Sequence, residues 1–156
     1  HLVEEHGLAD ASHMVSPNRE GIVRCMRLAL ENSGTRAEDV DYICAHGTGT
    51  AANDLTEGMA VKTVFGDVPP PISSIKSMLG HSMGAASGFG AIASVLALHE
   101  GFLPPTVNHR QTDHRLMGLD VVPNASRPAH IGVVQNNGFA FGGNNAIVIF
   151  GKEDRA

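Results

Sequence analysis

The chain has 156 residues, a formal net charge of −5 with neutral histidines and a hydrophobic fraction of 42%. Its length suffices for one domain with a hydrophobic core, and we expect residues 1–156 to form a single domain. The mild acidity and the absence of any block of lysine or arginine argue against a nucleic-acid partner, which would need clustered basic residues.

The cysteines and the hydropathy of the chain indicate the cellular environment of the protein. Cys25 and Cys44 form neither a CxxC motif nor a regular disulfide framework, so a reducing, cytoplasmic setting is the simpler interpretation. The most apolar stretch, residues 78–98, is broken by His81 and three serines, which predicts no membrane span. We expect no signal peptide. Because the chain starts with His1 rather than methionine, we expect it to be part of something longer.

The first predicted helix follows a segment without a clear pattern. Residues 1–15 show no period, and Ser16 and Pro17 then indicate a helix start, with the serine as cap. Three apolar residues recur at helical spacing: Ile22, Met26 and Leu30. Gly34 closes this helix, and the capping-box spacing of residues 35–38 predicts one more short turn.

A buried strand is predicted next, over residues 40–45, because this short run is apolar. The motif His46-Gly47-Thr48-Gly49-Thr50 follows at once, at the end of a strand where open α/β sheets bind their ligands. We expect Asn53 or Asp54 to cap a second helix that ends near Phe65. A proline-rich loop and a brief strand over residues 72–75 come after it.

The third predicted helix, Met83–His99, is crowded with small residues and carries no charge before Glu100. A helix that is apolar all round is normally buried. Each helical glycine costs up to about 1 kcal/mol relative to alanine, so close approach of neighbouring backbones should offset that cost. The pattern therefore predicts a central helix between two layers.

Two strands, residues 131–135 and 146–150, are predicted to flank a loop over residues 136–145. Strands that alternate with helices predict a layered α/β domain. No internal repeat or flexible linker interrupts it.

Three motifs carry candidate chemistry. The loop of His46 combines an imidazole that can transfer protons near neutral pH with glycines that permit close ligand approach. A glycine turn that happens to contain a histidine is the alternative, and His-Gly alone would favour it. The second motif, residues 76–81, places His81 before a helix N-terminus, whose dipole favours a neutral imidazole. Its alternative is a solvated Lys76 and a histidine cap.

The third motif is the turn Phe139-Ala140-Phe141-Gly142-Gly143, which can present backbone N–H groups to an oxyanion. In isolation a hairpin loop with two core phenylalanines would be favoured. The other seven histidines form no HExxH or Cys-plus-His pattern, and we predict no metal site.

Taken together and in order, the three motifs resemble the C-terminal region of the β-ketoacyl-acyl-carrier-protein synthases, the condensing enzymes of fatty acid and polyketide synthesis. The resemblance runs from about His13 through Phe150, and includes Glu57 after the first motif and Asn145 after the third. It implies the C-terminal half of a thiolase-like fold, layered α/β/α/β/α. Two histidines rather than a His–Asn pair point away from the chain-initiating branch. The sequences of the second and third motifs are more similar to those of discrete synthases than to those of modular ones.

The resemblance also implies roles for individual residues. His46 and His81 resemble the catalytic pair that polarises a malonyl thioester, promotes decarboxylation and stabilises the enolate. Lys76 and Glu57 resemble the charged pair that supports this site. The remaining implied site residues are Thr48 and Thr50, which would contact the pantetheine arm or extender unit, and Phe141, whose backbone N–H would complete the oxyanion hole in a gating turn with Phe139 and Gly142.

The implied reaction is decarboxylative Claisen condensation of an acyl thioester with malonyl-ACP, through an acyl group on a cysteine. No cofactor would bind directly, since substrates would arrive on the 4'-phosphopantetheine of an acyl carrier protein. The nucleophilic cysteine has no counterpart here, so we expect an N-terminal half or a complementary synthase subunit, in a homo- or heterodimer. Cys25 and Cys44 are interpreted as buried, inert thiols, with Cys44 pointing to the opposite face from Ala45.

Two further departures from the family pattern lie in the gating turn. Ala140 stands where glycine is usual, which matters if this position needs a positive φ. Asn144 stands where threonine is usual. Two other functions stay open: a non-catalytic, chain-length-determining partner subunit, and a thiolase-like acyltransferase or hydrolase that acts on CoA esters.

Overall fold

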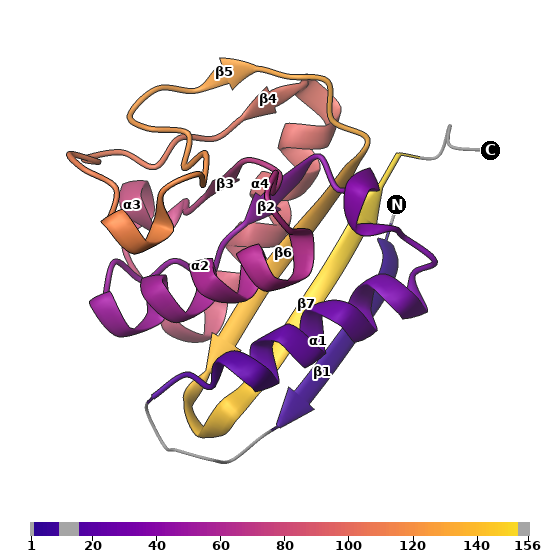
Figure 1. Ribbon diagram of the computed structural model, residues 1–156. Helices are drawn as coiled ribbons and strands as arrows, with labels where there is room; N and C mark the ends of the chain where they lie inside the picture. The colour runs from indigo at the N-terminus through magenta and orange to yellow at the C-terminus, as the bar shows by residue number, and fades with distance from the viewer. Residues whose placement is uncertain (1, 10–15, 153–156) are drawn as a thin grey trace.

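The computed structural model describes residues 2–9 and 16–152 (Figure 1). Its main element is a five-stranded sheet in the order β1-β7-β6-β2-β3. Strand β2 is parallel to both β3 and β6, whereas β7 is antiparallel to both β6 and β1. The five strands are β1 (Leu2–Ala9), β2 (Tyr42–Cys44), β3 (Ile72–Ser73), β6 (Val133–Ala140) and β7 (Asn144–Gly151). A small second sheet pairs β4 (Phe102–Leu103) with β5 (Arg127–Pro128).

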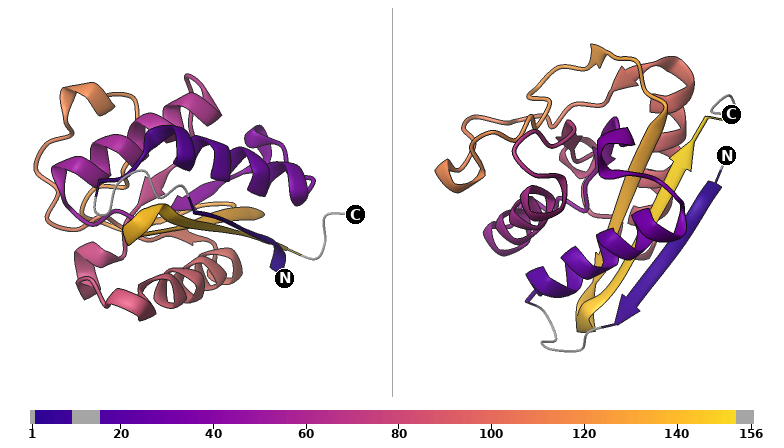
Figure 2. Two further views of the ribbon diagram at one scale, coloured as in Figure 1. Left: turned by 90° about the horizontal axis from the view of Figure 1, so that it is seen from below. Right: turned by 45° about the vertical axis from the view of Figure 1, so that its right-hand side comes forward.

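Helices cover both faces of the large sheet (Figure 2). Helices α1 (Arg19–Asn32) and α2 (Ala51–Phe65) lie on one face, and α4 (Ala86–Glu100) lies on the other. Each face has its own cluster of buried apolar residues. The short elements are α3 (Lys76–Leu79) and the 3₁₀ turns η1 (Ala37–Asp39), η2 (Met83–Ala85), η3 (His114–Leu116) and η4 (Phe141–Gly143). The predicted α/β layering is therefore present, with one sheet between two helix layers.

Helix α1 buries the predicted apolar stripe but starts later than expected. Asn18, not Ser16, is the cap, and its side-chain oxygen accepts from the N–H of Glu20 at 3.0 Å and of Gly21 at 3.4 Å. Asparagine caps as well as serine does, and here it directly precedes the first helical residue. The Ser16 prediction was wrong for this reason.

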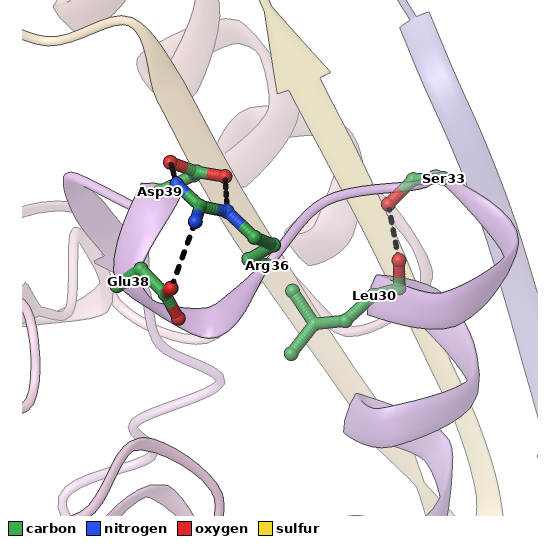
Figure 3. Close-up of polar contacts among 5 residues, drawn as sticks. All are labelled: Leu30, Ser33, Arg36, Glu38 and Asp39. Carbon is green, nitrogen blue, oxygen red and sulfur yellow. Dashed lines mark hydrogen bonds and ion pairs between the residues drawn. The ribbon is translucent and has the colours of Figure 1, made fainter.

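The turn after α1 is held by an ion-pair cluster rather than by a capping box (Figure 3). Arg36 donates to both carboxylate oxygens of Asp39 at 2.9 Å and lies 3.1 Å from the Glu38 carboxylate. Arg36 itself stands at the cap position of η1 and makes no side-chain capping bond. The predicted turn therefore exists, but the predicted capping box is wrong because a guanidinium contact takes its place.

Helix α2 is capped by Thr50, whose Oγ1 accepts from the N–H of Asn53 at 3.4 Å. The prediction of Asn53 or Asp54 as cap was wrong, because both side chains already lie inside the helix, where Asn53 donates to Glu57. Strand β3 is shorter than predicted, because the chain turns into α3 directly after it. Helix α3 had not been predicted.

The C-terminal hairpin is longer than predicted, and most of the expected loop 136–145 is strand. Only η4 separates β6 from β7. Asn136 and Asn137 suggested a loop, but they point to opposite sides of β6. Asn136 donates to the carbonyl of Ser87 at 3.2 Å, and Asn137 donates to Glu57 at 2.9 Å. Their amides are satisfied by tertiary partners, so the strand continues. Residues 2–9, which showed no period, pair with β7 as the edge strand β1.

Helix α4 approaches the sheet as closely as its glycines predicted, but only on one side. A Cβ at Gly90 would lie 2.4 Å from Oδ1 of Asn136, so any larger residue would force that side chain to move. The opposite side carries large apolar residues that are 45–58% exposed: Phe89, Ile92, Val95 and Leu96. The expectation of burial all round was therefore wrong for this chain, because nothing in its described part covers this outer face.

Candidate active site

His46 stands directly beyond β2, and its ring is held by strand β6. The side chain is 9% exposed, and its Nδ1 accepts from the backbone N–H of Phe139 at 3.3 Å. With Nδ1 accepting, the neutral ring carries its proton on Nε2. Burial, together with the smaller effects of the charges on Lys76 and His81, lowers the pKa of His46 to about 4. His46 is therefore a neutral N–H donor at physiological pH.

His81 lies just before η2 and α4, as the sequence predicted, and is exposed. Its Nδ1 accepts from the N–H of Met83 at 3.0 Å, so its neutral ring also presents N–H at Nε2. The centroids of the His46 and His81 rings are 5.8 Å apart, with the planes at 84°. The structure thus brings together two residues 35 positions apart in sequence, each with Nδ1 occupied by the backbone.

Glu57 is the buried anchor of the His46 loop. One carboxylate oxygen accepts from the N–H of His46 at 2.8 Å and from Nδ2 of Asn137 at 2.9 Å. The other accepts from the N–H of Gly47 at 2.9 Å and from Nδ2 of Asn53 at 3.3 Å. Burial raises the pKa of Glu57, and these four hydrogen bonds oppose that rise.

Lys76 contacts the other side of the His46 backbone, because its Nζ donates to the carbonyl of His46 at 2.5 Å. Burial lowers the pKa of Lys76, while the negative charge of Glu57 counters the shift. No ion pair joins Lys76 to Glu57 within residues 2–9 and 16–152. The two charged side chains therefore bracket His46 through its backbone, one at the carbonyl and one at the N–H.

Gly47 combines a positive φ with a close contact, so a residue with a side chain would not fit there. Its φ is +41°, and a Cβ there would lie 2.4 Å from Cβ of Ser74. Ser74 donates to the Gly47 carbonyl at 2.6 Å, which fixes the loop against β3. Beyond it, the hydroxyl oxygens of Thr48 and Thr50 lie 2.9 Å apart at the surface.

The turn after β6 separates its two phenylalanines. Phe139 is buried with its ring 5.5 Å from that of His46, whereas Phe141 is 65% exposed. Ala140 has an ordinary extended φ of −123°, so alanine is accommodated without strain. The positive φ values of the turn, 75° and 74°, fall on Gly142 and Gly143. Asn144 donates to the carbonyl of Phe141 at 3.0 Å and closes the turn.

The two cysteines are buried on opposite faces of the sheet, Cys25 on the inner side of α1 and Cys44 in the cluster beside α4. Burial raises the pKa of each thiol to about 11. Ala45 packs in the apolar cluster on the opposite face of the sheet from Cys44, as the alternation of side chains along the strand predicted. Both thiols are therefore protonated and shielded, as expected of structural cysteines.

Several residues of the site were not singled out from the sequence: Ser74, Gln135 and Asn137. The polar triplet at 135–137 inside an otherwise apolar strand was the available signal. A cavity of about 480 Å³ lies behind the His46 loop, between α2 and residues 106–121, with Glu57 and Lys76 in its lining. In the described residues we find no group of three or more His, Cys, Asp or Glu side chains placed to hold a metal. No helix in that part of the chain has the length and apolarity needed to cross a membrane.

Comparison with known families and sequences agrees with the motifs. The family model described as "Beta-ketoacyl synthase, C-terminal domain" matches residues 3–110. Nodulation protein E of Rhizobium meliloti is 48% identical over 144 residues, which cover 91% of this chain and 36% of that protein. 3-Oxoacyl-[acyl-carrier-protein] synthase 1 of Escherichia coli K12 is 40% identical over 144 residues, which cover 92% of this chain and 34% of the synthase.

Solved structures give the same result. The ishigamide ketosynthase/chain length factor superposes with a TM-score of 0.94 at 54% identity, over 97% of this chain and 37% of that one. A β-ketoacyl synthase from Burkholderia phymatum gives 0.92 at 34% identity, over 97% and 37%. These neighbours confirm the predicted fold class, an α/β unit from the C-terminal part of a thiolase-like enzyme. The chain spans about a third of the length of the relatives that it matches.

Proposed function

This chain belongs to the β-ketoacyl synthase family, and we propose that it supplies the two catalytic histidines of a decarboxylative condensing enzyme. The nucleophilic cysteine would come from an N-terminal segment or a complementary subunit, and we call the resulting assembly the complete synthase. The observation that carries the proposal is the arrangement of His46 and His81, each with Nδ1 accepting a backbone N–H and Nε2–H left for substrate.

The chemistry follows from two Nε2–H donors near one carbonyl. When the malonyl group loses carbon dioxide, the electron pair of the broken carbon–carbon bond moves into an enolate whose charge sits on the thioester oxygen. Donors preorganised at that oxygen stabilise the charge as it develops. The enolate carbon then attacks the acyl group on the cysteine and displaces the thiolate, which forms the new carbon–carbon bond. Because His46 has a pKa of about 4, it stays a neutral donor throughout.

Substrate delivery would occur on the 4'-phosphopantetheine of an acyl carrier protein, with no cofactor bound directly. Thr48 and Thr50 present hydroxyls at the surface of the His46 loop, where the pantetheine arm would pass. Phe141 would act as the gate from the exposed turn, with Phe139 and Gly142 holding its base. One structural neighbour, 30% identical, is a ketosynthase in complex with its acyl-carrier protein.

The remainder of the synthase would cover the outer face of α4, whose apolar residues are open in this chain. A homo- or heterodimer is the proposed assembly, since neighbours include ketosynthase and chain length factor pairs. Neither cysteine forms a disulfide in the described structure, which fits the cytoplasmic setting that we propose.

The test is decarboxylation of malonyl-ACP by the complete synthase, followed as loss of carbon dioxide by mass spectrometry. His46→Ala and His81→Ala should each slow it by about 100-fold or more, the effect of removing one oxyanion donor. His99→Ala, which changes an exposed histidine at the far end of α4, is the control. Decarboxylation at the wild-type rate in both site variants would reject the proposal.

A non-catalytic, chain-length-determining role is the second candidate, because the ishigamide neighbour includes a chain length factor. Such a subunit has no chemical need for either histidine, and both are retained with their Nδ1 atoms hydrogen-bonded.

The third candidate is a thiolase-like acyltransferase that acts on CoA esters. The same assay with malonyl-CoA in place of malonyl-ACP tests it.

A further inference from the structure

Strand β6 contains a chain of side-chain amides that ends on Glu57. Gln135 donates from Nε2 to Oδ1 of Asn137 at 2.8 Å, and Asn137 donates from Nδ2 to Glu57 at 2.9 Å. All three side chains are at least 98% buried. Two residues further along the same strand, the N–H of Phe139 donates to the His46 ring. Strand β6 therefore contacts His46 directly through Phe139 and indirectly through Glu57.

Asn137 shares a carboxylate oxygen with the backbone N–H of His46. Both groups donate to Oε1 of Glu57, so the position of that oxygen sets the position of the His46 peptide. Among the two side-chain donors to Glu57, Asn137 is the closer, and Asn53 divides its Nδ2 between Glu57 and Asp54. Loss of Asn137 would therefore leave the carboxylate with one shared side-chain donor.

Gln135 orients Asn137. Because its Nε2 occupies Oδ1 of Asn137, the amide nitrogen of Asn137 must face Glu57. This arrangement has a cost, since Oε1 of Gln135 is buried with no hydrogen-bond partner among the described residues. A buried unpaired amide oxygen is unfavourable, and an apolar side chain of similar size would avoid it. A stabilising role alone does not account for a glutamine here.

Other ionisable groups surround Glu57 without replacing this amide. His46 and Cys44 belong to β2 and its loop, Lys76 to α3, and Asp54 to the preceding turn of α2. From residues 106–121, His109 and Asp113 line the same cavity as Glu57. None of them donates a hydrogen bond from its side chain to the carboxylate in the described structure.

We propose that Asn137, oriented by Gln135, is a positioning residue for His46 and acts through the carboxylate of Glu57. The inference rests on the proposed function for its catalytic meaning, and on the hydrogen bonds of β6 for its structural content. It assigns a reason to the polar residues Gln135 and Asn137, and it places the control of the catalytic loop on the neighbouring strand.

The test measures malonyl-ACP decarboxylation by the complete synthase as a function of pH. Asn137→Ala removes a hydrogen bond to the ionised form of Glu57, which disfavours ionisation and raises its pKa. The acid limb of the rate profile should move up by about one pH unit, and activity should return toward the wild-type value above it. Gln135→Leu should shift the limb in the same direction by less, while the protein melts no lower than wild type.

Asn136→Ala is the matched control, because Asn136 is the adjacent residue of β6, equally buried, and donates one hydrogen bond on the other face. It should leave the acid limb in place. If Asn137→Ala and Gln135→Leu also leave the limb in place, or if Asn136→Ala moves it equally, Asn137 is structural and the proposal is overturned.

A second readout does not depend on activity. Hydrogen–deuterium exchange at neutral pH reports the His46 and Gly47 amides, which donate to Glu57. These amides should exchange about ten-fold faster in Asn137→Ala than in Asn136→Ala. Equal exchange would overturn the positioning role. An inactive wild-type synthase with the expected exchange difference would instead reject only the proposed function.

Discussion

The two faces of the sheet are covered in different ways. On the face of α1 and α2, Ile22 and Met26 are fully buried, and the polar side of α1 faces solvent. On the other face, α4 packs Gly90 against the sheet yet exposes Phe89 and Ile92 on its outer side. The first is the ordinary pattern of a surface helix, whereas a helix with apolar residues on both sides is built to lie between two layers.

The candidate site spans both regions, and its two histidines differ accordingly. His46 belongs to the covered face, where burial lowers its pKa, while His81 begins the uncovered α4 segment and is exposed. The surroundings of His46 are therefore complete within this chain. His81 instead borders a surface that we expect to be covered in the complete synthase.

The largest expected effect is from a charge on the outer face of α4. Phe89→Asp should destabilise the complete synthase by about 4 kcal/mol, because a buried carboxylate without a partner is costly. The measurement is the free energy of unfolding in urea, together with the yield of assembled protein. Arg27→Asp, on the exposed side of α1, is the control and should change stability by less than about 0.5 kcal/mol. Equal small effects would mean that α4 faces solvent in the complete synthase too.

The sequence predicted the features that depend on local pattern. The apolar run before His46 predicted β2, and the small residues of the third helix predicted the close contact at Gly90. It failed where a distant partner decides. The polar side chain of Asn137 suggested a loop. Its hydrogen-bond partner, Glu57, lies 80 residues away, and the local sequence does not reveal it. The bracketing of the His46 peptide by Glu57 and Lys76 likewise depends on tertiary contacts that no local pattern contains.

The second prediction concerns the buried histidine on the covered face. The folded pKa of His46 is about 4 against 6.5 in an unfolded chain, so between these values the unfolded state binds more protons. Stability should therefore fall as pH decreases from 6.5 toward 4, by up to about 3 kcal/mol in total. Urea unfolding across this range should show a shallower decline in His46→Asn.

His99→Asn provides the comparison for this effect, because His99 is an exposed histidine on α4 with a side-chain exposure of 79%. An identical pH slope in wild type and His46→Asn would show that His46 does not titrate in its buried site as expected.

The smallest effect distinguishes the two sides of α4 with a single methyl group. Gly90→Ala places a Cβ 2.4 Å from Asn136 and should lower the free energy of unfolding by about 2 kcal/mol.

Gly88, two residues away, has no heavy atom within 4 Å of the position that a Cβ would take. If its side of the helix stays open, alanine there should stabilise the protein by up to about 1 kcal/mol through helix propensity. We expect the opposite in the complete synthase, a loss of about 1 kcal/mol, because the layer that covers Phe89 would also meet the new methyl group. Thermal unfolding of the two variants beside wild type gives the sign directly, and a gain in Gly88→Ala would contradict a middle-layer position for α4.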